Sequence, residues 1–286
     1  MTDLYSLSDR GVLRIAGPEA REFLQGLVTN DVAAAAPDRA IYAALLTPQG
    51  KFLFDFFIAD AGDGALLLDT DRERLPDLKK RLTLYKLRAD VEIEDASGHW
   101  SVWADVEAAS SAPGAAETDG ADIVFTDPRH AGLGRRRFKK GEAIADVEAI
   151  ARYDAHRLGF GAPIAVADIK PEKSFALESN LDDLNAIDFQ KGCYVGQEVT
   201  SRTKRRGVVR KRILTLDVEG EAPAPGASVS AGGSEIGEVL SGRGGRALAL
   251  IRLDRWAAAS AQPETEGRPV QIGVPGWLSL PQPEKA

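Results

Sequence analysis

The only cysteine of the chain, Cys193, is the side chain whose surroundings most favour chemistry. It follows Lys191 and lies between Gly192 and Gly196, two glycines that let the backbone come close to a ligand or partner. The segment GQEVTSRTKRR that starts at Gly196 has the pattern of a helix start, so the thiol is expected just ahead of a helix N-terminus. Free N–H groups there and the Lys191 ammonium both stabilise a thiolate. We therefore predict a functional thiol whose site is shaped by Lys191, Gly192, Tyr194, Gly196, Gln197 and Glu198.

One cysteine and three histidines exclude several classes of site. An internal disulfide needs a second thiol, and a four-thiolate metal site needs three more. His99, His130 and His156 lack the spacing of metal ligands. We therefore expect no intrinsic metal site, and Cys193 would act alone or with a sulfur or metal that another molecule supplies. The alternative is a buried cysteine that packs as a small apolar side chain.

A second candidate is Asp55, an acid inside the strand-like run FLFDFFIA. Side chains alternate along a strand, and the phenylalanines of this run fall on both faces. Both faces are therefore apolar, which argues against the alternative of a solvent-facing Asp55. A buried carboxylate needs a hydrogen-bond partner or a proton, so Asp55 is a candidate for a ligand pocket.

Basic residues gather after the cysteine, although the formal net charge of the chain is −7. The run comprises Arg202, Lys204, Arg205, Arg206, Arg210, Lys211 and Arg212. It can contact an acidic small molecule, an acidic protein or RNA phosphates, or it can form a solvated face. No aromatic residues interleave with the charges, so base stacking is poorly supported and nucleic-acid binding is not expected.

The composition is that of a soluble globular protein, with 44% hydrophobic and 28% charged residues. No run approaches ~18 uncharged apolar residues, so no membrane span is expected. The first residues, MTDLYSLSDRGVL, lack the features of a signal or transit peptide. A lone thiol suits a reducing compartment. These features together predict a cytoplasmic protein.

Strand and helix patterns alternate over the part of the chain that must position these residues. Strands are expected at 10–15, 41–46 and 51–60, and helices at 17–30, around 75–82 and at 144–158. The basic stretch Arg135–Lys140 is expected on an edge strand or turn, and residues 108–120 in a surface loop.

From Arg210 onward the pattern changes to short strands and turns rich in glycine and proline. This predicts a small antiparallel barrel or sandwich. We place a boundary near residue 208, which divides the chain into an α+β body, residues 1–207, and an all-β domain, residues 208–286.

The stretch Leu177–Ile213, with its core KGCYVGQE, resembles the signature region of the YgfZ/GcvT-like family. These are folate-binding proteins linked to iron–sulfur cluster assembly and repair. Weaker similarity extends from the VTND segment near Asn30 to the last strands. The resemblance implies an α+β, GcvT-like fold, in which two α/β portions surround a central hole and a small antiparallel β-barrel follows.

The resemblance also implies ligands and partners. Tetrahydrofolate is expected as a cofactor, with Asp55 in its pocket and Arg202, Arg205 and Arg206 near its glutamate tail. An A-type iron–sulfur carrier or client iron–sulfur proteins are expected as partners, and Cys193 as a ligand to a shared cluster.

Two departures separate the chain from the related aminomethyltransferases. Where those enzymes carry a pair of aspartates, the stretch Gly50–Asp55 retains one and has phenylalanine in place of the other. Where they carry Arg-x-Glu-x-Gly, the stretch Arg157–Gly161 lacks the glutamate. We therefore favour a folate-binding accessory protein for maturation or repair of iron–sulfur proteins over a folate-dependent one-carbon transferase or demethylase. An RNA-modification accessory protein is a weaker alternative.

Overall fold

The computed structural model describes residues 4–108, 111–206 and 209–280, except for the side chain of Arg206. The chain groups into two compact units. Unit 1 contains the chain up to Gln49, Leu53–His156 and Leu184–Gln197, and unit 2 contains Gly50–Phe52, Arg157–Asp183 and the chain from Glu198 onward. Each unit is therefore built from separate stretches of sequence. The boundary expected near 208 falls at residues 207–208, outside the described residues, and stays a prediction.

The described strands of unit 1 form two five-stranded sheets. The first has the order β1-β7-β10-β9-β8, from β1 (Leu4–Ser6), β7 (Trp100–Asp105), β8 (Ala116–Asp119), β9 (Asp122–Thr126) and β10 (Arg135–Lys140). The second has the order β3-β4-β5-β2-β6, from β2 (Arg10–Ala16), β3 (Ile41–Leu46), β4 (Phe52–Asp60), β5 (Leu66–Asp71) and β6 (Glu92–Asp95).

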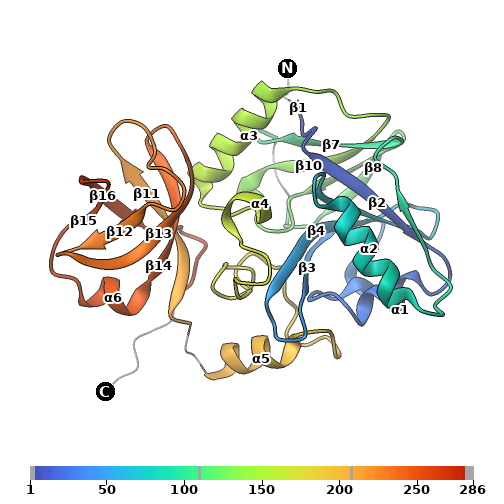
Figure 1. Cartoon of the computed structure of the whole chain (residues 1–286). Coiled ribbons are helices and arrows are strands. Elements are labelled where there is room, and N and C mark those ends of the chain that lie inside the picture. The colour runs from blue at the N-terminus through green and yellow to red at the C-terminus, as the bar shows by residue number, and fades with distance from the viewer. Residues whose placement is uncertain (1–3, 109–110, 207–208, 281–286) are drawn as a thin grey trace. The chain divides into compact units, whose positions relative to one another are not determined.

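Helices α1 (Ala20–Gln25) and α2 (Leu75–Lys86) cover one face of the second sheet, as Figure 1 shows for α2. Leu24, Leu78 and Leu82 of these helices are buried in one cluster with Phe54 and Phe56 of β4. Unit 1 also contains η1 (Val32–Ala34), η2 (Ala131–Leu133) and the first part of α3 (Val147–Phe160).

The other face of the second sheet packs on the first sheet through a row of aromatic rings. The ring centroids of Tyr42 and Phe57 are 5.0 Å apart, those of Phe57 and Phe125 6.4 Å, and those of Phe125 and Phe138 5.7 Å. Because side chains alternate along a strand, successive residues of β4 point in turn to the helix-covered face and to this inter-sheet face. Both faces of β4 are buried, which explains its nearly continuous apolar sequence.

The C-terminal part of unit 2 is a closed barrel with the strand order β11-β14-β13-β12-β15-β16, drawn in orange to red in Figure 1. Its elements are β11 (Lys211–Val218), β12 (Ser228–Ala231), β13 (Ser234–Arg243), β14 (Arg246–Arg252), α6 (Leu253–Ala258), β15 (Pro263–Thr265) and β16 (Arg268–Gly273). Apolar side chains such as Leu216, Val239 and Ile251 fill its interior. The barrel predicted from Arg210 onward is confirmed. Unit 2 also contains α4 (Ala165–Asp168) and most of α5 (Gln197–Arg206).

The prediction of an edge strand or turn at Arg135–Lys140 is wrong, because this stretch is β10, the central strand of the first sheet. Arg136 and Phe138 are buried, whereas Arg135, Arg137 and Lys139 are half-buried. A buried arginine had no visible partner in the sequence, and the carboxylate of Asp69 supplies one. Helix α3 begins at Val147, so the predicted start at 144 is three residues early and Ile144 is exposed.

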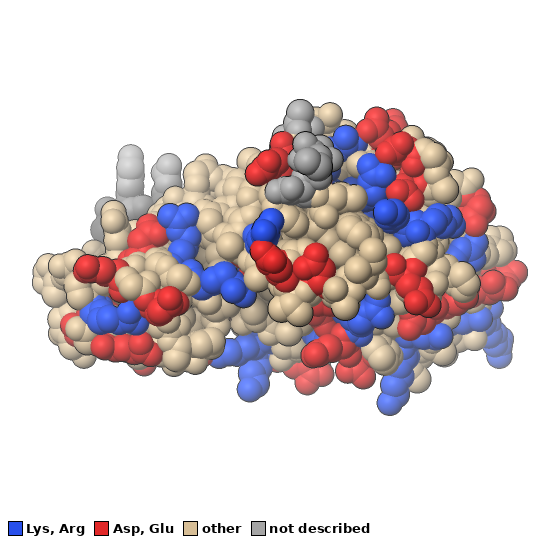
Figure 2. All heavy atoms as spheres, turned by 90° about the horizontal axis from the view of Figure 1, so that it is seen from above, with Lys and Arg blue, Asp and Glu red and all other residues tan. Residues whose placement is uncertain are grey.

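No helix in the described stretches is both long and apolar enough to cross a membrane. On the face that Figure 2 shows, cationic and acidic side chains are interspersed.

Candidate functional site

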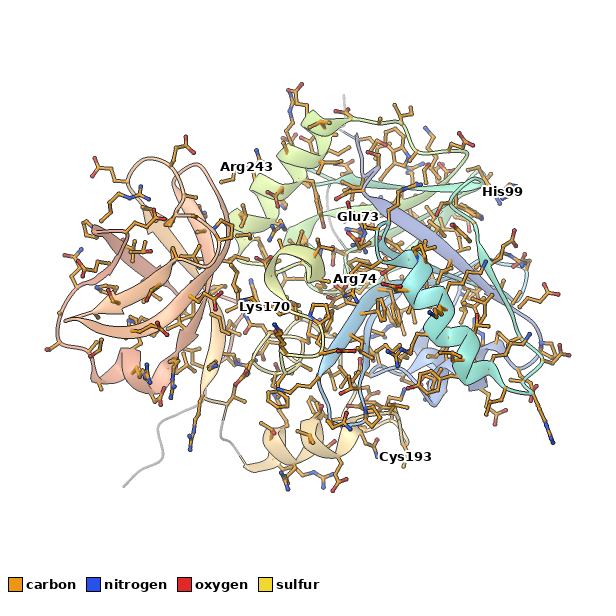
Figure 3. The ribbon with its side chains drawn as sticks, viewed as in Figure 1. Glu73, Arg74, His99, Lys170, Cys193 and Arg243 are labelled. Atoms are coloured by element: carbon orange, nitrogen blue, oxygen red, sulfur yellow. The ribbon has the colours of Figure 1, made fainter. Side chains whose placement is uncertain are left out.

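Cys193 is exposed on the stretch that leads into α5 (Figure 3). It precedes Gln197, the first residue of that helix, as the sequence predicted. The alternative of a buried cysteine is therefore wrong. Gly192, beside it, is also exposed, and a Cβ atom there would meet no heavy atom within 4 Å. The thiol is thus open to another molecule.

Lys191 fixes the thiol-bearing stretch to the rest of unit 1. Its Nζ donates to the carbonyl oxygens of Gln25 at 2.9 Å, Val28 at 2.7 Å and Asn30 at 2.7 Å. An ammonium has three N–H donors, and these bonds use all of them. Burial lowers the pKa of Lys191 to about 8, against the opposing effect of nearby carboxylates. The structure shows Lys191 as an anchor, a role that the sequence did not predict, and the expected effect of this cation on the thiol stays a prediction.

Short-range hydrogen bonds hold the backbone on both sides of Cys193. The Asp188 side chain accepts from the backbone N–H of Gln190 at 2.7 Å and of Lys191 at 3.2 Å. The Gln197 side chain accepts from the backbone N–H of Tyr194 at 3.1 Å. Gly196 has a φ of 83°, a conformation that glycine adopts without strain. Hydrogen bonds between its own residues therefore fix the backbone of the stretch around the thiol.

Tyr194 is the buried member of the motif and is 7% exposed. Its hydroxyl has no hydrogen-bond partner among the described residues, and burial raises the pKa of Tyr194 to about 12. Glu198 is exposed.

The described residues contain no group of three or more histidine, cysteine or acidic side chains that could hold a metal ion. His99, for instance, lies at the opposite end of unit 1 from Cys193 (Figure 3). Cys193 is therefore not part of any such group in the described stretches.

Asp55 is buried on β4, with 5% of its surface exposed, so the solvent-facing alternative is wrong. Its Oδ2 accepts a hydrogen bond of 2.6 Å from the hydroxyl of Tyr42 on the neighbouring strand β3. Burial and the adjacent Asp55 carboxylate raise the pKa of Tyr42 well above its ordinary value. Tyr42 therefore stays protonated and donates a hydrogen bond to Asp55.

A buried ion network surrounds this pair between the two sheets. Asp69 accepts from Arg10 at 2.6 Å and also pairs with Arg136. Arg129 forms a two-pronged pair with Asp127, at 3.0 and 2.8 Å. These five side chains are buried or nearly so, and their removal from water is compensated by mutual pairing.

Two further contacts tie the network together. The hydroxyl of Tyr153 accepts from Arg129 at 2.9 Å and from Arg136 at 2.8 Å. The ring of Phe57 has the guanidinium carbons of Arg136, Arg129 and Arg10 at 4.1, 5.0 and 6.0 Å from its centroid. Burial alone would lower the pKa of Arg10, but the Asp69 and Asp55 carboxylates raise it above its ordinary value.

A cavity of about 490 Å³ opens in unit 1 beside Tyr42. Its described lining consists of Asn30, Arg39, Ala40, Ile41, Tyr42, Pro113, Pro128, Asn185, Ile187, Asp188, Phe189 and Gln190. Asp55 is absent from this described lining and is connected to it through the Tyr42 hydroxyl. The amide of Asn30 donates to the carbonyls of Tyr42 and Asn185, at 2.7 and 2.8 Å, and so joins two walls of the cavity.

The basic run does not form one uniform face. Arg202, Arg205 and Arg210 are exposed. Lys204 pairs with Asp182 at 2.8 Å, and the buried Arg212 pairs with the same carboxylate at 2.6 Å. The Arg206 side chain lies outside the described residues. Two of the predicted cations are therefore structural, and the exposed ones remain candidates for ligand contact.

The stretch that lacks the transferase glutamate also has a structural role. Arg157 is 1% exposed and pairs with Asp168 at 2.7 Å. The carboxylate of Asp168 also accepts from the backbone N–H of Ile164 and from the hydroxyl of Ser241. The carboxylate of Asp168 therefore pairs with groups of unit 2 and has a structural role there.

Two family models match the chain. The model of the GCVT N-terminal domain matches residues 2–104, and that of the CAF17 C-terminal β-barrel domain matches residues 210–280.

Curated relatives extend the similarity over nearly the whole sequence. The human protein named iron–sulfur cluster assembly factor IBA57, mitochondrial, is 35% identical over 301 residues, which are 96% of this chain and 84% of that protein. The chain belongs to the IBA57 family of GcvT-like proteins. The mouse IBA57 protein is 33% identical over 303 residues, with the same two coverages. The IBA57 homologue of Mycosarcoma maydis is 32% identical over 325 residues, which are 95% of this chain and 80% of the homologue.

The GcvT-like fold expected from the KGCYVGQE motif is confirmed. The crystal structure of the glycine cleavage system aminomethyltransferase T from Bartonella henselae superposes with a TM-score of 0.74. That structure shares 15% sequence identity, and the match covers 96% of this chain and 86% of the aminomethyltransferase. At this identity the likeness concerns the fold alone.

The expected cytoplasmic location is wrong, because the curated IBA57 relatives are named as mitochondrial proteins. A lone thiol suits any compartment that keeps thiols reduced, so it could not identify the cytoplasm.

Several residues of the site were missed in the sequence. Tyr42 lies in an apolar strand, and only its hydroxyl, opposite an acid on the next strand, hints at a pair. Arg10, Asp69 and Arg136 come from distant segments, so nothing in the sequence links them. The three carbonyls that bind Lys191 belong to the main chain and leave no trace in residue types.

Proposed function

We propose that this IBA57-family protein supports the maturation or repair of iron–sulfur proteins, with Cys193 as its ligand to a cluster. The observation that carries the proposal is that the only thiol of the chain is exposed, while hydrogen bonds hold the stretch that carries it in place. The names of the IBA57 relatives support the same role.

The chemistry assigned to Cys193 is that of a single soft ligand. A thiolate binds iron well, and one thiolate from this chain leaves the other iron sites to ligands from a partner. The cluster is then cargo that two proteins hold together, one of them an A-type carrier or a client iron–sulfur protein. The open surroundings of Gly192 suit the approach of such a partner.

We also propose that unit 1 binds tetrahydrofolate in the cavity beside Tyr42. The volume, about 490 Å³, falls within the usual ~300–1,000 Å³ of small-molecule sites. The lining offers the aromatic side chain of Phe189 together with polar groups, a fit for a flat polar ring system. When bound, tetrahydrofolate supplies a reduced pterin that can carry a one-carbon unit. Asp55 acts on the site indirectly, because its buried hydrogen bond holds Tyr42 in place behind the cavity.

The one-carbon transferase alternative has less support. Of the two acids expected in such an enzyme near β4, the chain keeps Asp55 alone, and this carboxylate is occupied by Tyr42. The next acid after Arg157, Asp168, is committed to an ion pair.

A complementation experiment tests the proposed role. Cells depleted of their own protein receive either the wild-type chain or the Cys193→Ser variant, and the activities of iron–sulfur enzymes are measured against enzymes without clusters. We expect the wild type to restore them and the variant to fail at equal protein level. Full restoration by Cys193→Ser would reject the role of the thiol.

A further inference from the structure

Arg39 is a cation at the cavity of unit 1 that no part of the described chain uses. It belongs to the lining and its side chain is exposed. Its guanidinium makes no ion pair and no hydrogen bond with any described residue. Other arginines of unit 1, such as Arg14 and Arg21, pair with carboxylates.

The backbone that carries Arg39 is held firmly. Its N–H donates to the carbonyl of Ala36 at 2.9 Å, its own carbonyl accepts from Ala36 at 2.8 Å, and a β-bridge joins it to Ala115. Gly114, next to that bridge, has a φ of 83°, and a Cβ atom there would lie 2.5 Å from the carbonyl oxygen of Ala40. The close approach of these two segments therefore depends on glycine, and it fixes the backbone from which the Arg39 side chain extends.

The rest of the lining indicates which part of a ligand would meet this cation. Asn30 and Asn185 donate their amide N–H groups to backbone carbonyls, and Tyr42 donates its hydroxyl to Asp55. Arg39 is thus the unpaired cation of the described lining. A guanidinium without a partner favours a carboxylate, which it can bind through two parallel hydrogen bonds.

We propose that Arg39 binds the carboxylate end of an aromatic ligand whose ring system lies in this cavity. The inference rests on the proposed folate site and assigns the glutamate tail of the folate to Arg39 rather than to the basic run at α5. A folate with more glutamates gains little beyond the first one, because a single described cation faces the cavity.

Calorimetric titration under anaerobic conditions tests the assignment. Tetrahydrofolate, 6-methyltetrahydropterin without a tail, and p-aminobenzoylglutamate without a pterin are each titrated into the wild type and into Arg39→Gln. Arg88→Gln is the matched control, since Arg88 is exposed and lies outside the described lining. We expect Arg39→Gln to bind tetrahydrofolate about tenfold or more weakly, with unchanged binding of the tail-free pterin and an unchanged melting temperature.

The outcomes separate this inference from the folate proposal. Equal affinity of wild type and Arg39→Gln for tetrahydrofolate would overturn the role of Arg39 and leave the folate site standing. Binding of p-aminobenzoylglutamate that needs Arg39, without any binding of tetrahydrofolate, would support Arg39 and reject the folate site. If the wild type bound none of the three ligands, both proposals would fall.

Discussion

Replacing Lys191 by methionine tests whether this residue anchors the thiol-bearing stretch. Methionine keeps much of the length and apolar character of the side chain but removes all three N–H donors. The carbonyls of Gln25, Val28 and Asn30 then lose the donor that joins them to residue 191. The variant should therefore be less stable, while Cys193 stays exposed.

The size of the loss follows from two opposing contributions. Three hydrogen bonds at a net ~1 kcal/mol each give about 3 kcal/mol. Partial burial of the ammonium, which lowers the pKa of Lys191, works against them. We expect a decrease of ~1–3 kcal/mol in the free energy of unfolding at pH 7, measured by urea denaturation.

The matched control is Lys80→Met, which removes an exposed ammonium from α2 without a described partner and should change stability by less than ~0.5 kcal/mol. Labelling of Cys193 by iodoacetamide completes the assay. An anchor predicts lower stability with a labelling rate that is not reduced. A purely electrostatic role of Lys191 predicts slower labelling with unchanged stability, and that result would refute the reasoning.

Three further predictions concern the buried groups of unit 1. Asp69→Asn should lower the free energy of unfolding by ~3–5 kcal/mol, because it leaves the guanidiniums of Arg10 and Arg136 without their shared carboxylate; a loss below ~1 kcal/mol in chemical denaturation would contradict the network. Tyr42→Phe removes the hydroxyl donor to Asp55, so it should lower the free energy of unfolding by ~1–3 kcal/mol and weaken tetrahydrofolate binding in calorimetry. A variant equal to wild type in both measurements would show that the Tyr42–Asp55 hydrogen bond contributes to neither. The pKa of Lys191 is about 8 in the folded chain instead of 10.5, so residue 191 binds more protons in the unfolded chain between these pH values. The stability of the wild type relative to Lys191→Met should therefore rise with pH across that window. Parallel pH profiles of the two proteins in denaturation would reject the lowered pKa.

The sequence predicted best what depends on local pattern. The short strands and glycine-rich turns after Arg210 predicted the barrel, because a chain of short alternating strands has few other ways to bury its apolar faces. The apolar residues on both faces of β4 correctly predicted that Asp55 is buried. The helix pattern after Gly196 correctly placed Cys193 ahead of a helix.

What depends on pairing between distant segments could not be predicted. Arg136 belongs to a basic run that is typical of a surface, and its carboxylate partner Asp69 lies on a strand of the other sheet. The anchor of Lys191 uses main-chain carbonyls, which every residue has. Arg39 gave no signal either, since its importance depends on the cavity that folding creates around it.

The central claim, that Cys193 binds a cluster held jointly with a partner, is tested most directly by spectroscopy of a reconstituted mixture. The wild-type protein and the Cys193→Ser variant are each mixed anaerobically with an A-type carrier loaded with a [2Fe–2S] cluster. Visible absorption and circular dichroism are recorded, and the complex is isolated by size exclusion. We expect the wild type to form a complex that contains both proteins and the cluster, with a spectrum different from that of the carrier alone, and the serine variant to leave the carrier spectrum unchanged. A serine variant that forms the same complex with the same spectrum would contradict the account.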